Sequence, residues 1–194
     1  YTYLLFLLLG NFNPMTASYL FMLSAAVMII PLFYGVFMIT KNKNKAYLMV
    51  VVYTLLPYYI DYTRFLWNPN FQHAYTPLLL LFTGLFIQSK KHKTLFAFFT
   101  GTMAGFLLHY HYQYVPIIVF TAWFIFNDGK DVKKLLLFFL GTGVGFSPII
   151  LFELRNNFYN VRTVVLFLQH WSVVTRDYTA GATGYYWLSL SLFF

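Results

Sequence analysis

The chain has 194 residues, of which 60% are hydrophobic, 23% aromatic and only 9% charged. A soluble domain needs far more charge to cover its surface, so this composition indicates a polytopic membrane protein. Cysteine is absent, which excludes disulfides and thiolate metal sites. We expect one all-α transmembrane domain over residues 1–194, with about six full spans and a surface helix, cut off at both ends.

The formal net charge of +8 is distributed unevenly. Every lysine falls in one of three short segments, KNKNK at 41–45, KKHK at 90–93 and GKDVKK at 129–134, and every arginine lies elsewhere. By the positive-inside rule, the lysine segments are cytoplasmic loops of a multi-pass plasma-membrane protein. Nucleic-acid binding is excluded because it needs a continuous basic face.

The first half of the chain is predicted to contain three spans. Residues Tyr1–Leu9 are too short to cross a bilayer and form either the tail of a lost span or an interfacial helix. A full span follows over 15–40, where Pro31 is expected to introduce a kink. The segment 46–60 returns to the outer side, and 71–88 runs back to the second lysine loop.

The apolar run 94–126 would reach about 50 Å as one helix, against a bilayer core of about 30 Å. It must therefore turn back, and the polar stretch HYHYQY at 109–114 is the expected turn, on the outer side. A further span is predicted over 135–152, followed by an amphipathic surface helix over 163–174. Residues 185–194 begin another span.

The stretch PYYIDYTRFLWNPN at 57–70 carries the only Asp and the only Arg of the first half of the chain. Charged residues beside an apolar span are expensive, which makes them functional candidates. Asp61, Arg64 and Asn68 have helical spacing and would share one stripe of a helix. A mutual Asp–Arg ion pair is the alternative reading.

Polar groups at the outer ends of other spans complete the candidate site. The pair His109 and His111 would face one another on an extended turn and could bind a divalent metal, although hydrogen bonding to substrate or plain interfacial placement is favoured. Glu153 and Arg155 bind substrate or form a local pair. The predicted substrate-binding residues are Asp61, Arg64, Trp67, Asn68, Asn70, His109, His111, Gln113, Glu153, Arg155 and Asn156. The alternative is ordinary interfacial loops with an aromatic belt.

Motifs of soluble phosphate-binding and hydrolytic enzymes are missing from the sequence. No glycine-rich phosphate loop is followed by Lys and Ser or Thr, and no serine-centred nucleophile elbow occurs. The GTGVG segment at 141–145 lies inside a span, where small residues serve close helix packing. The residues alone predict arginines on the outer face, which suit a lipid phosphate or diphosphate.

Four segments together resemble the bacterial GT-C glycosyltransferases, in the branch of protein O-mannosyltransferases and aminoarabinose transferases. They are YLLFLLLGNFNPMTASYL, YTRFLWNPN, LLHYHYQYVPIIVF and SPIILFELRNNFYNVR. The resemblance implies a membrane enzyme that moves a sugar from a polyprenyl-phosphate donor to a lipid, protein or glycan acceptor on the outer face. It also implies a catalytic acid in a loop before Tyr1, and donor-facing roles for Arg64, Glu153 and Arg155.

Asn68 stands where the family often has a second acidic residue, which bears on metal dependence. A divalent metal is the only cofactor considered. The rival functions are a transporter or flippase of a lipid-linked or amphipathic substrate, which would need polar groups in mid-span and two related halves, and a non-catalytic scaffold.

Overall fold

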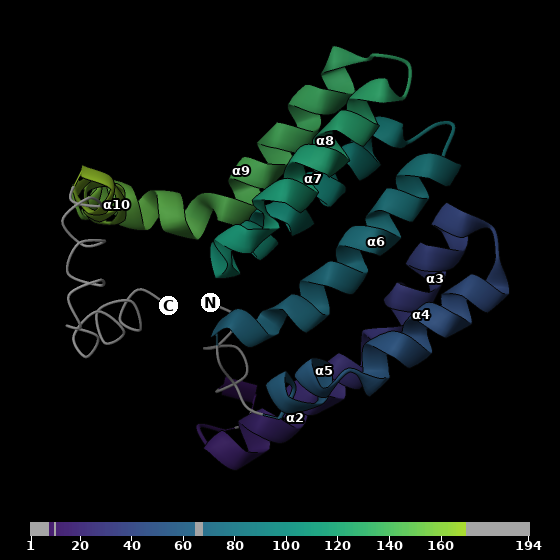
Figure 1. Ribbon diagram of the computed structural model, residues 1–194, viewed down its shortest axis with the longest axis horizontal. Coiled ribbons are helices and arrows are strands. Elements are labelled where there is room, and N and C mark those ends of the chain that lie inside the picture. Colours follow the sequence, from purple (N-terminus) through teal and green to yellow (C-terminus); the bar gives the residue numbers. More distant parts are fainter. Residues whose placement is uncertain (1–7, 10, 65–67, 170–194) are drawn as a thin grey trace, which may run out of the picture. The chain divides into compact units, whose positions relative to one another are not determined.

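The computed structural model describes residues 8–9, 11–64 and 68–169, and over these residues the protein is all-α, as expected (Figure 1). Contacts divide the chain into two compact units, Tyr1–Pro148 and Ile149–Phe194. The helices are α2 (Pro14–Val27), α3 (Ile29–Thr40), α4 (Lys43–Leu55), α5 (Pro57–Tyr62), η1 (Asn68–Phe71), α6 (Gln72–Gln88), α7 (Lys93–Tyr110), η2 (Tyr112–Tyr114), α8 (Val115–Asn127), α9 (Val132–Arg155) and α10 (Tyr159–Gln169).

Two stretches of the described chain are long and apolar enough to cross a membrane, judged by length and composition. One is Pro14–Thr40, formed by α2 and α3, and the other is α9. Only 28% and 17% of their most apolar windows are buried, whereas the core helix of a soluble protein would be mostly buried. The other four expected spans remain a prediction; α8, for example, is apolar but has 13 residues.

The first long stretch is interrupted at Met28, between α2 and α3. Pro31 follows three residues later, has no N–H, and cannot donate to the carbonyl of Val27. The interruption lies one turn before this proline, where its missing N–H acts, and the kink itself remains a prediction. Asn13 caps the start of α2, where its side chain accepts hydrogen bonds from the backbone N–H groups of Met15 and Thr16.

The return segment 46–60 is not one continuous helix. Leu56 is extended and Pro57 starts a new helix, as the steric restriction on the residue before proline requires. The expected helical stripe of Asp61, Arg64 and Asn68 is wrong, because α5 ends at Tyr62 and Asn68 lies in η1. Asn68 itself precedes a proline, which disfavours the α conformation there.

The apolar run 94–126 turns back at the predicted position, residues 109–114. Helix α7 ends at Tyr110, His111 is extended, η2 makes one turn, and α8 starts at Val115. A helix, α10, covers the described part of the range predicted for the surface helix and begins at Tyr159 rather than at residue 163; its position along a membrane surface remains a prediction. Predictions for residues 170–194, including the final span, lie outside the described part of the chain.

Glycines allow α7 and α9 to pack backbone against backbone. A Cβ added to Gly141 would lie 2.1 Å from the carbonyl oxygen of Phe98, and one added to Gly145 would lie 2.2 Å from that of Thr102. The contact is reciprocal, since a Cβ on Gly101 or Gly105 would meet α9 backbone oxygens at 1.9 and 2.2 Å. The close packing predicted for GTGVG is confirmed.

The same device joins α3 and α6. A Cβ on Gly35 would lie 2.6 Å from backbone atoms of Leu80 and Leu81, and Gly84 faces Met38 in return. At the ends of these helices, Gln88 Nε2 donates to the carbonyl oxygen of Met38 over 2.7 Å. Figure 1 shows α3 and α6 running side by side, as do α7 and α9.

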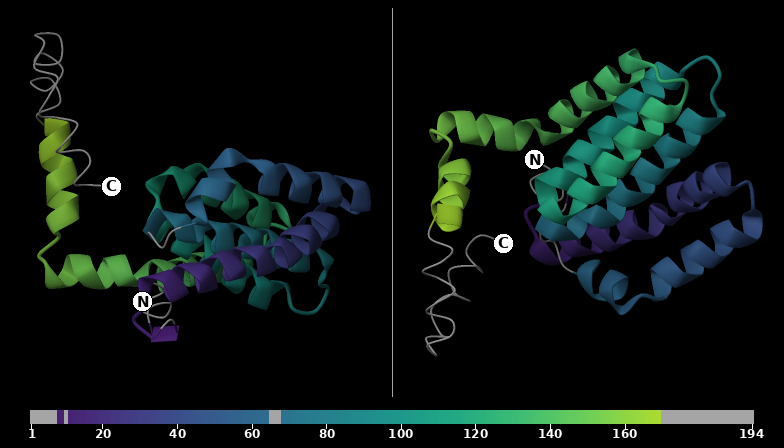
Figure 2. Two further views of the ribbon diagram at one scale, coloured as in Figure 1. Left: turned by 90° about the horizontal axis from the view of Figure 1, so that it is seen from below. Right: turned by 45° about the horizontal axis from the view of Figure 1, so that its top comes forward.

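The three lysine segments lie at one end of the Tyr1–Pro148 unit, at the upper right in Figure 1, and the turns containing η1 and η2 lie at the opposite end. Figure 2 shows the same separation from a second direction. Asp128 joins two of the lysine loops, because it accepts from Lys93 and, over 2.6 Å, from Lys134. Partial desolvation raises the pKa of Asp128, but hydrogen bonds and charge from these lysines outweigh it and hold the pKa below 3.8.

Substitution of Gly145 by alanine is expected to destabilise the protein, by about 1–3 kcal/mol, because its Cβ would enter the α7 backbone. Gly143→Ala is the matched control, since nothing lies within 4 Å of its Cβ position. Thermal unfolding in detergent measures both. Equal loss in the two variants would contradict the packing described above.

Asp128→Asn is expected to lower stability at neutral pH by at most about 1 kcal/mol, as the pair is partly exposed. The folded pKa of Asp128 is depressed, so its contribution exists above the ordinary pKa of 3.8 and is lost as the pH falls below it. Melting temperatures of both proteins against pH should therefore converge in acid. Asp131→Asn, which keeps the cap on Lys133 N–H, is the control; a difference that persists in acid would refute the charge-based account.

Candidate functional site

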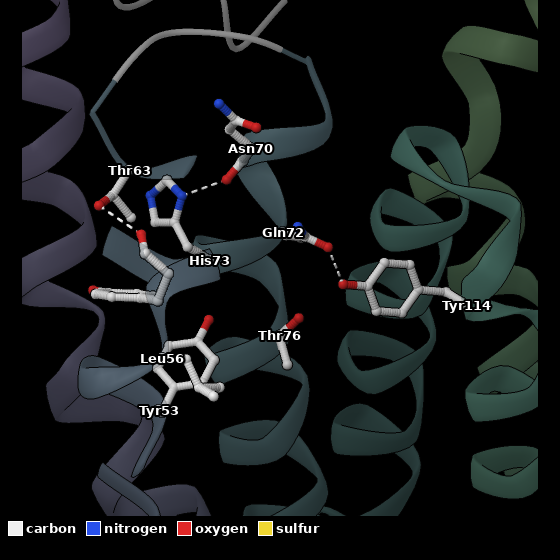
Figure 3. A pocket seen from close by; sticks show the side chains of 9 residues that line it. Tyr53, Leu56, Thr63, Asn70, Gln72, His73, Thr76 and Tyr114 are labelled. Carbon is white, nitrogen blue, oxygen red and sulfur yellow. Dashed lines mark hydrogen bonds between the residues drawn. The ribbon is translucent and has the colours of Figure 1, made fainter. Parts of the chain in front are cut away.

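A cavity of about 120 Å³ lies at the end of the Tyr1–Pro148 unit away from the lysine loops (Figure 3). It is formed where the end of α4, α5, η1, the start of α6 and η2 meet. Aromatic and apolar side chains form most of its wall. The lining residues are Tyr53, Leu56, Tyr59, Thr63, Asn70, Gln72, His73, Thr76 and Tyr114, none of which carries a permanent charge.

His73 is the most buried ring in the cavity wall, with 3% of its surface exposed. Its Nδ1 lies 2.5 Å from the carbonyl oxygen of Asn70. A carbonyl can only accept, so Nδ1 carries the proton and Nε2 has the lone pair. Figure 3 shows the ring held by this bond. The edge of His73 also packs against Phe21, with ring centroids 4.5 Å apart.

The other nitrogen of His73 lies 3.4 Å from the hydroxyl of Ser24. The Ser24 hydroxyl has one proton, and it donates that proton to the carbonyl of Phe21 over 2.6 Å. The serine is therefore not activated by the imidazole, and the pair lacks the geometry of a nucleophile with its base. His73 therefore forms a part of the cavity wall whose ring orientation is fixed by hydrogen bonding.

Two tyrosines tie the surrounding elements together. The hydroxyl of Tyr59 on α5 donates to the carbonyl of Ala25 on α2 over 2.9 Å. The hydroxyl of Tyr114 in η2 donates to Gln72 Oε1 on α6 over 2.5 Å. Phe71 and Tyr110 stack with centroids 5.4 Å apart. The 57–70 stretch and the HYHYQY turn are thus neighbours at one end of the unit.

The charged residues of the first predicted cluster lie outside this cavity wall. Asp61 and Arg64 are exposed, and in the described part of the chain no ion pair joins them. The alternative of a mutual ion pair is therefore not observed. Asn70 is fully buried and lines the cavity. Asn68 belongs to η1, and Trp67 lies outside the described residues.

The histidine turn supplies no complete metal site. His109 lies in the last turn of α7, where its Nδ1 is buried without a described partner, and His111 is the extended residue after the helix. The Nδ1 of His111 accepts from the backbone N–H of Gln113 over 3.4 Å. Among the described residues, no group of three His, Asp or Glu side chains could hold a metal, so no step is assigned to one.

In the Ile149–Phe194 unit, the Glu153 carboxylate is hydrogen-bonded to the start of α10 and not to an arginine. Its side chain is 6% exposed and accepts from Asn160 Nδ2 at 2.6 Å and from the backbone N–H groups of Asn160 and Val161 at 3.3 Å. Glu153 therefore caps the first turn of α10. Arg155 is exposed, and Asn156 donates to the carbonyl of Phe152 over 2.8 Å. The local Glu–Arg pair is not observed.

No known protein family, characterised protein or solved structure matches the chain. The site is therefore described from its own geometry. Of the predicted residues that the structure describes, Asn70 alone lines the cavity; Gln72, His73, Thr76 and Tyr114 were missed. Their signal in the sequence was weak, since uncharged polar residues at the start of an apolar helix are common. The Thr-Pro pair at 76–77 was the one sequence feature in α6 that could have drawn attention to this part of the cavity wall.

Replacing Glu153 by alanine is expected to expose the turn at Asn157 and Phe158 by releasing the start of α10. These two residues have φ of 53° and 59°, a conformation that the capped helix holds in place. Loss of a cap costs about 1 kcal/mol. Limited proteolysis should cut near residues 156–158 faster in Glu153→Ala than in Arg155→Ala, whereas equal cutting would argue against the cap.

Proposed function

We propose that this chain is part of a membrane glycosyltransferase that moves a sugar from a polyprenyl-phosphate donor to an acceptor at the outer face of the plasma membrane. The observation that carries the proposal is the division of the Tyr1–Pro148 unit into two ends. Lysine loops occupy one end, and a polar-edged cavity with exposed Asp61 and Arg64 occupies the other. By the positive-inside rule the lysine loops are on the cytoplasmic side, so the cavity at the opposite end opens to the outer side of the membrane.

Large apolar side chains face outward along the helices between these ends. Leu48 and Leu55 on α4 are 63% and 68% exposed, and Phe120 and Trp123 on α8 are 63% and 60% exposed. Soluble proteins rarely present such continuous apolar surface. We therefore infer that the shorter helices are also in lipid, which gives the six-span topology expected from the sequence.

The polar groups inside the helices favour a transferase over a transporter. Thr83, Thr100, Thr121 and Thr142 each donate to a backbone carbonyl one turn earlier in their own helix. Such back-bonded hydroxyls offer nothing to a passing substrate. A transporter would line its path at mid-membrane with polar groups or broken helices. The cavity lies where α4 ends and α6 begins, but beside Ser24 and Ala25 in the middle of the Pro14–Thr40 stretch, so the back-bonded hydroxyls and not its depth favour the transferase.

The arginines are the candidates for binding the lipid phosphate. Arg64 and Arg155 are both exposed and without an ion pair among the described residues, so their guanidinium groups can bind phosphate oxygens in a bidentate manner. The acceptor hydroxyl would attack the anomeric carbon, the lipid phosphate would leave, and the configuration would invert. We assign no general base within the chain.

The test measures sugar release and transfer from a polyprenyl-phosphate hexose in membranes that contain the protein. Arg64→Ala and Arg155→Ala, made separately, should each lower the rate about 10- to 100-fold, which is the loss of a charge-assisted hydrogen bond. Arg162→Ala is the matched control, because Arg162 is an exposed arginine in α10. Full activity of both test variants, or equal loss in the control, would count against phosphate binding by these arginines.

A further inference from the structure

The end of the Tyr1–Pro148 unit opposite the cavity has a large excess of positive charge. The three lysine segments lie there together and carry nine lysines, and the carboxylates beside them are Asp128 and Asp131 (Figure 1). The other charged residues of this unit are Asp61 and Arg64, one of each sign, in the 57–70 stretch. A formal excess of seven positive charges is therefore concentrated at one end of the unit.

The two carboxylates are already engaged, which leaves most of these lysines without a counter-charge. Asp128 accepts from Lys93 and, over 2.6 Å, from Lys134, and Asp131 lies 3.9 Å from Lys134. The other seven lysines, three in 41–45, two in 90–93 and two in 129–134, are exposed and form no ion pair with any residue that the structure describes. Like charges gathered on one face repel one another, and anions brought to that face relieve the repulsion.

Exposed apolar side chains lie directly beside these lysines on the same helices. On α4, the exposed Tyr47 and Leu48 follow Lys45 within one turn, and on α9 the exposed Leu136 follows Lys133 by three residues. Residues three apart share a helix face. A cation at the edge of an exposed apolar surface fits an anionic group carried on hydrocarbon chains. A free phosphate ion or an acidic protein segment would use the charge alone, so the arrangement favours a phospholipid.

We propose that the lysine face, defined as the seven exposed lysines of 41–45, 90–93 and 129–134, binds the headgroups of anionic phospholipids in the cytoplasmic leaflet. Anionic headgroups attract lysines at the membrane surface, whereas a zwitterionic headgroup carries its own cation and gains less. The inference goes beyond sugar transfer and needs only that the Tyr1–Pro148 unit lies in a bilayer. Absence of transferase activity would leave it standing.

Trp123 provides a reporter at this end, because it is exposed on α8 four residues before that helix ends at Asn127. The full chain, with its other three tryptophans replaced by phenylalanine, is placed in vesicles of equal parts phosphatidylcholine and phosphatidylglycerol. One lipid or the other is supplied in brominated form, which quenches tryptophan fluorescence. Brominated phosphatidylglycerol should quench Trp123 more strongly, and potassium chloride should reduce the difference by screening the exposed charges.

A reporter at the other end of the unit localises the effect. Leu55 is the exposed last residue of α4, the helix that begins at Lys43. Leu55→Trp, made together with Trp123→Phe, should be quenched almost equally by the two brominated lipids. Equal quenching at Trp123, or an equal preference for phosphatidylglycerol at both reporters, would overturn the proposal. Native mass spectrometry of the unaltered chain, which should retain more phosphatidylglycerol than phosphatidylcholine, tests the proposal without the tryptophan substitutions.

Replacing Lys130 and Lys133 together by glutamine should lower the preference for phosphatidylglycerol at Trp123 about threefold or more, because each lysine near an anionic surface contributes up to about fivefold. Replacing both by arginine keeps the charge and should retain the preference. Unchanged preference in the glutamine variant, or equal loss in the arginine variant, would refute binding by charge. Loss of the preference on adding polyglutamate, but not potassium chloride of the same ionic strength, would assign the face to an acidic protein instead.

Discussion

Direct contact between helix backbones is the constraint on which the Tyr1–Pro148 unit depends. The added Cβ atoms that would collide at 1.9–2.6 Å belong to glycines of α3, α7 and α9, and they meet backbone, which cannot move aside. In the proposed membrane environment, helices gain little from burying apolar side chains, so close van der Waals contact would hold them together. The glycine pairs on α7 and α9 therefore fix the depth of one helix against the other. They also fix which loops meet at each end.

At irregular points of the helices in this unit, side chains donate hydrogen bonds to backbone carbonyl groups. Hydrogen bonds cannot be left to water in a hydrocarbon environment, so helix irregularities need internal partners. Ser147 provides one beside Pro148, and Tyr59 provides one for the carbonyl of Ala25, close to the break between α2 and α3.

The sequence was sufficient for the features that depend on length and local chemistry. Lysine segments marked the boundaries between helices, although Lys43, Lys45, Lys93, Lys133 and Lys134 already lie in the helices that follow. The 94–126 run was too long for one helix, and GTGVG indicated close packing. Features that depend on partners distant in sequence were not readable. The Glu153 cap requires α10 to start at Tyr159, and the burial of His73 requires Phe21 and Asn70 beside it. Charge drew attention to Asp61 and Arg64, whereas the cavity is lined by uncharged groups.

This separation of charged and uncharged groups has a physical reason. Enclosing an arginine in a cavity of this size would cost several kcal/mol unless a carboxylate or phosphate accompanied it. An exposed arginine keeps its hydration until an anion arrives, and only then exchanges water for phosphate oxygens. A neutral ring has no such requirement: it can be enclosed by aromatic side chains, provided that its hydroxyls find partners. The described lining of the cavity carries no permanent charge, whereas Arg64 is exposed outside it, so recognition of charge and enclosure of a neutral group are best served by different residues.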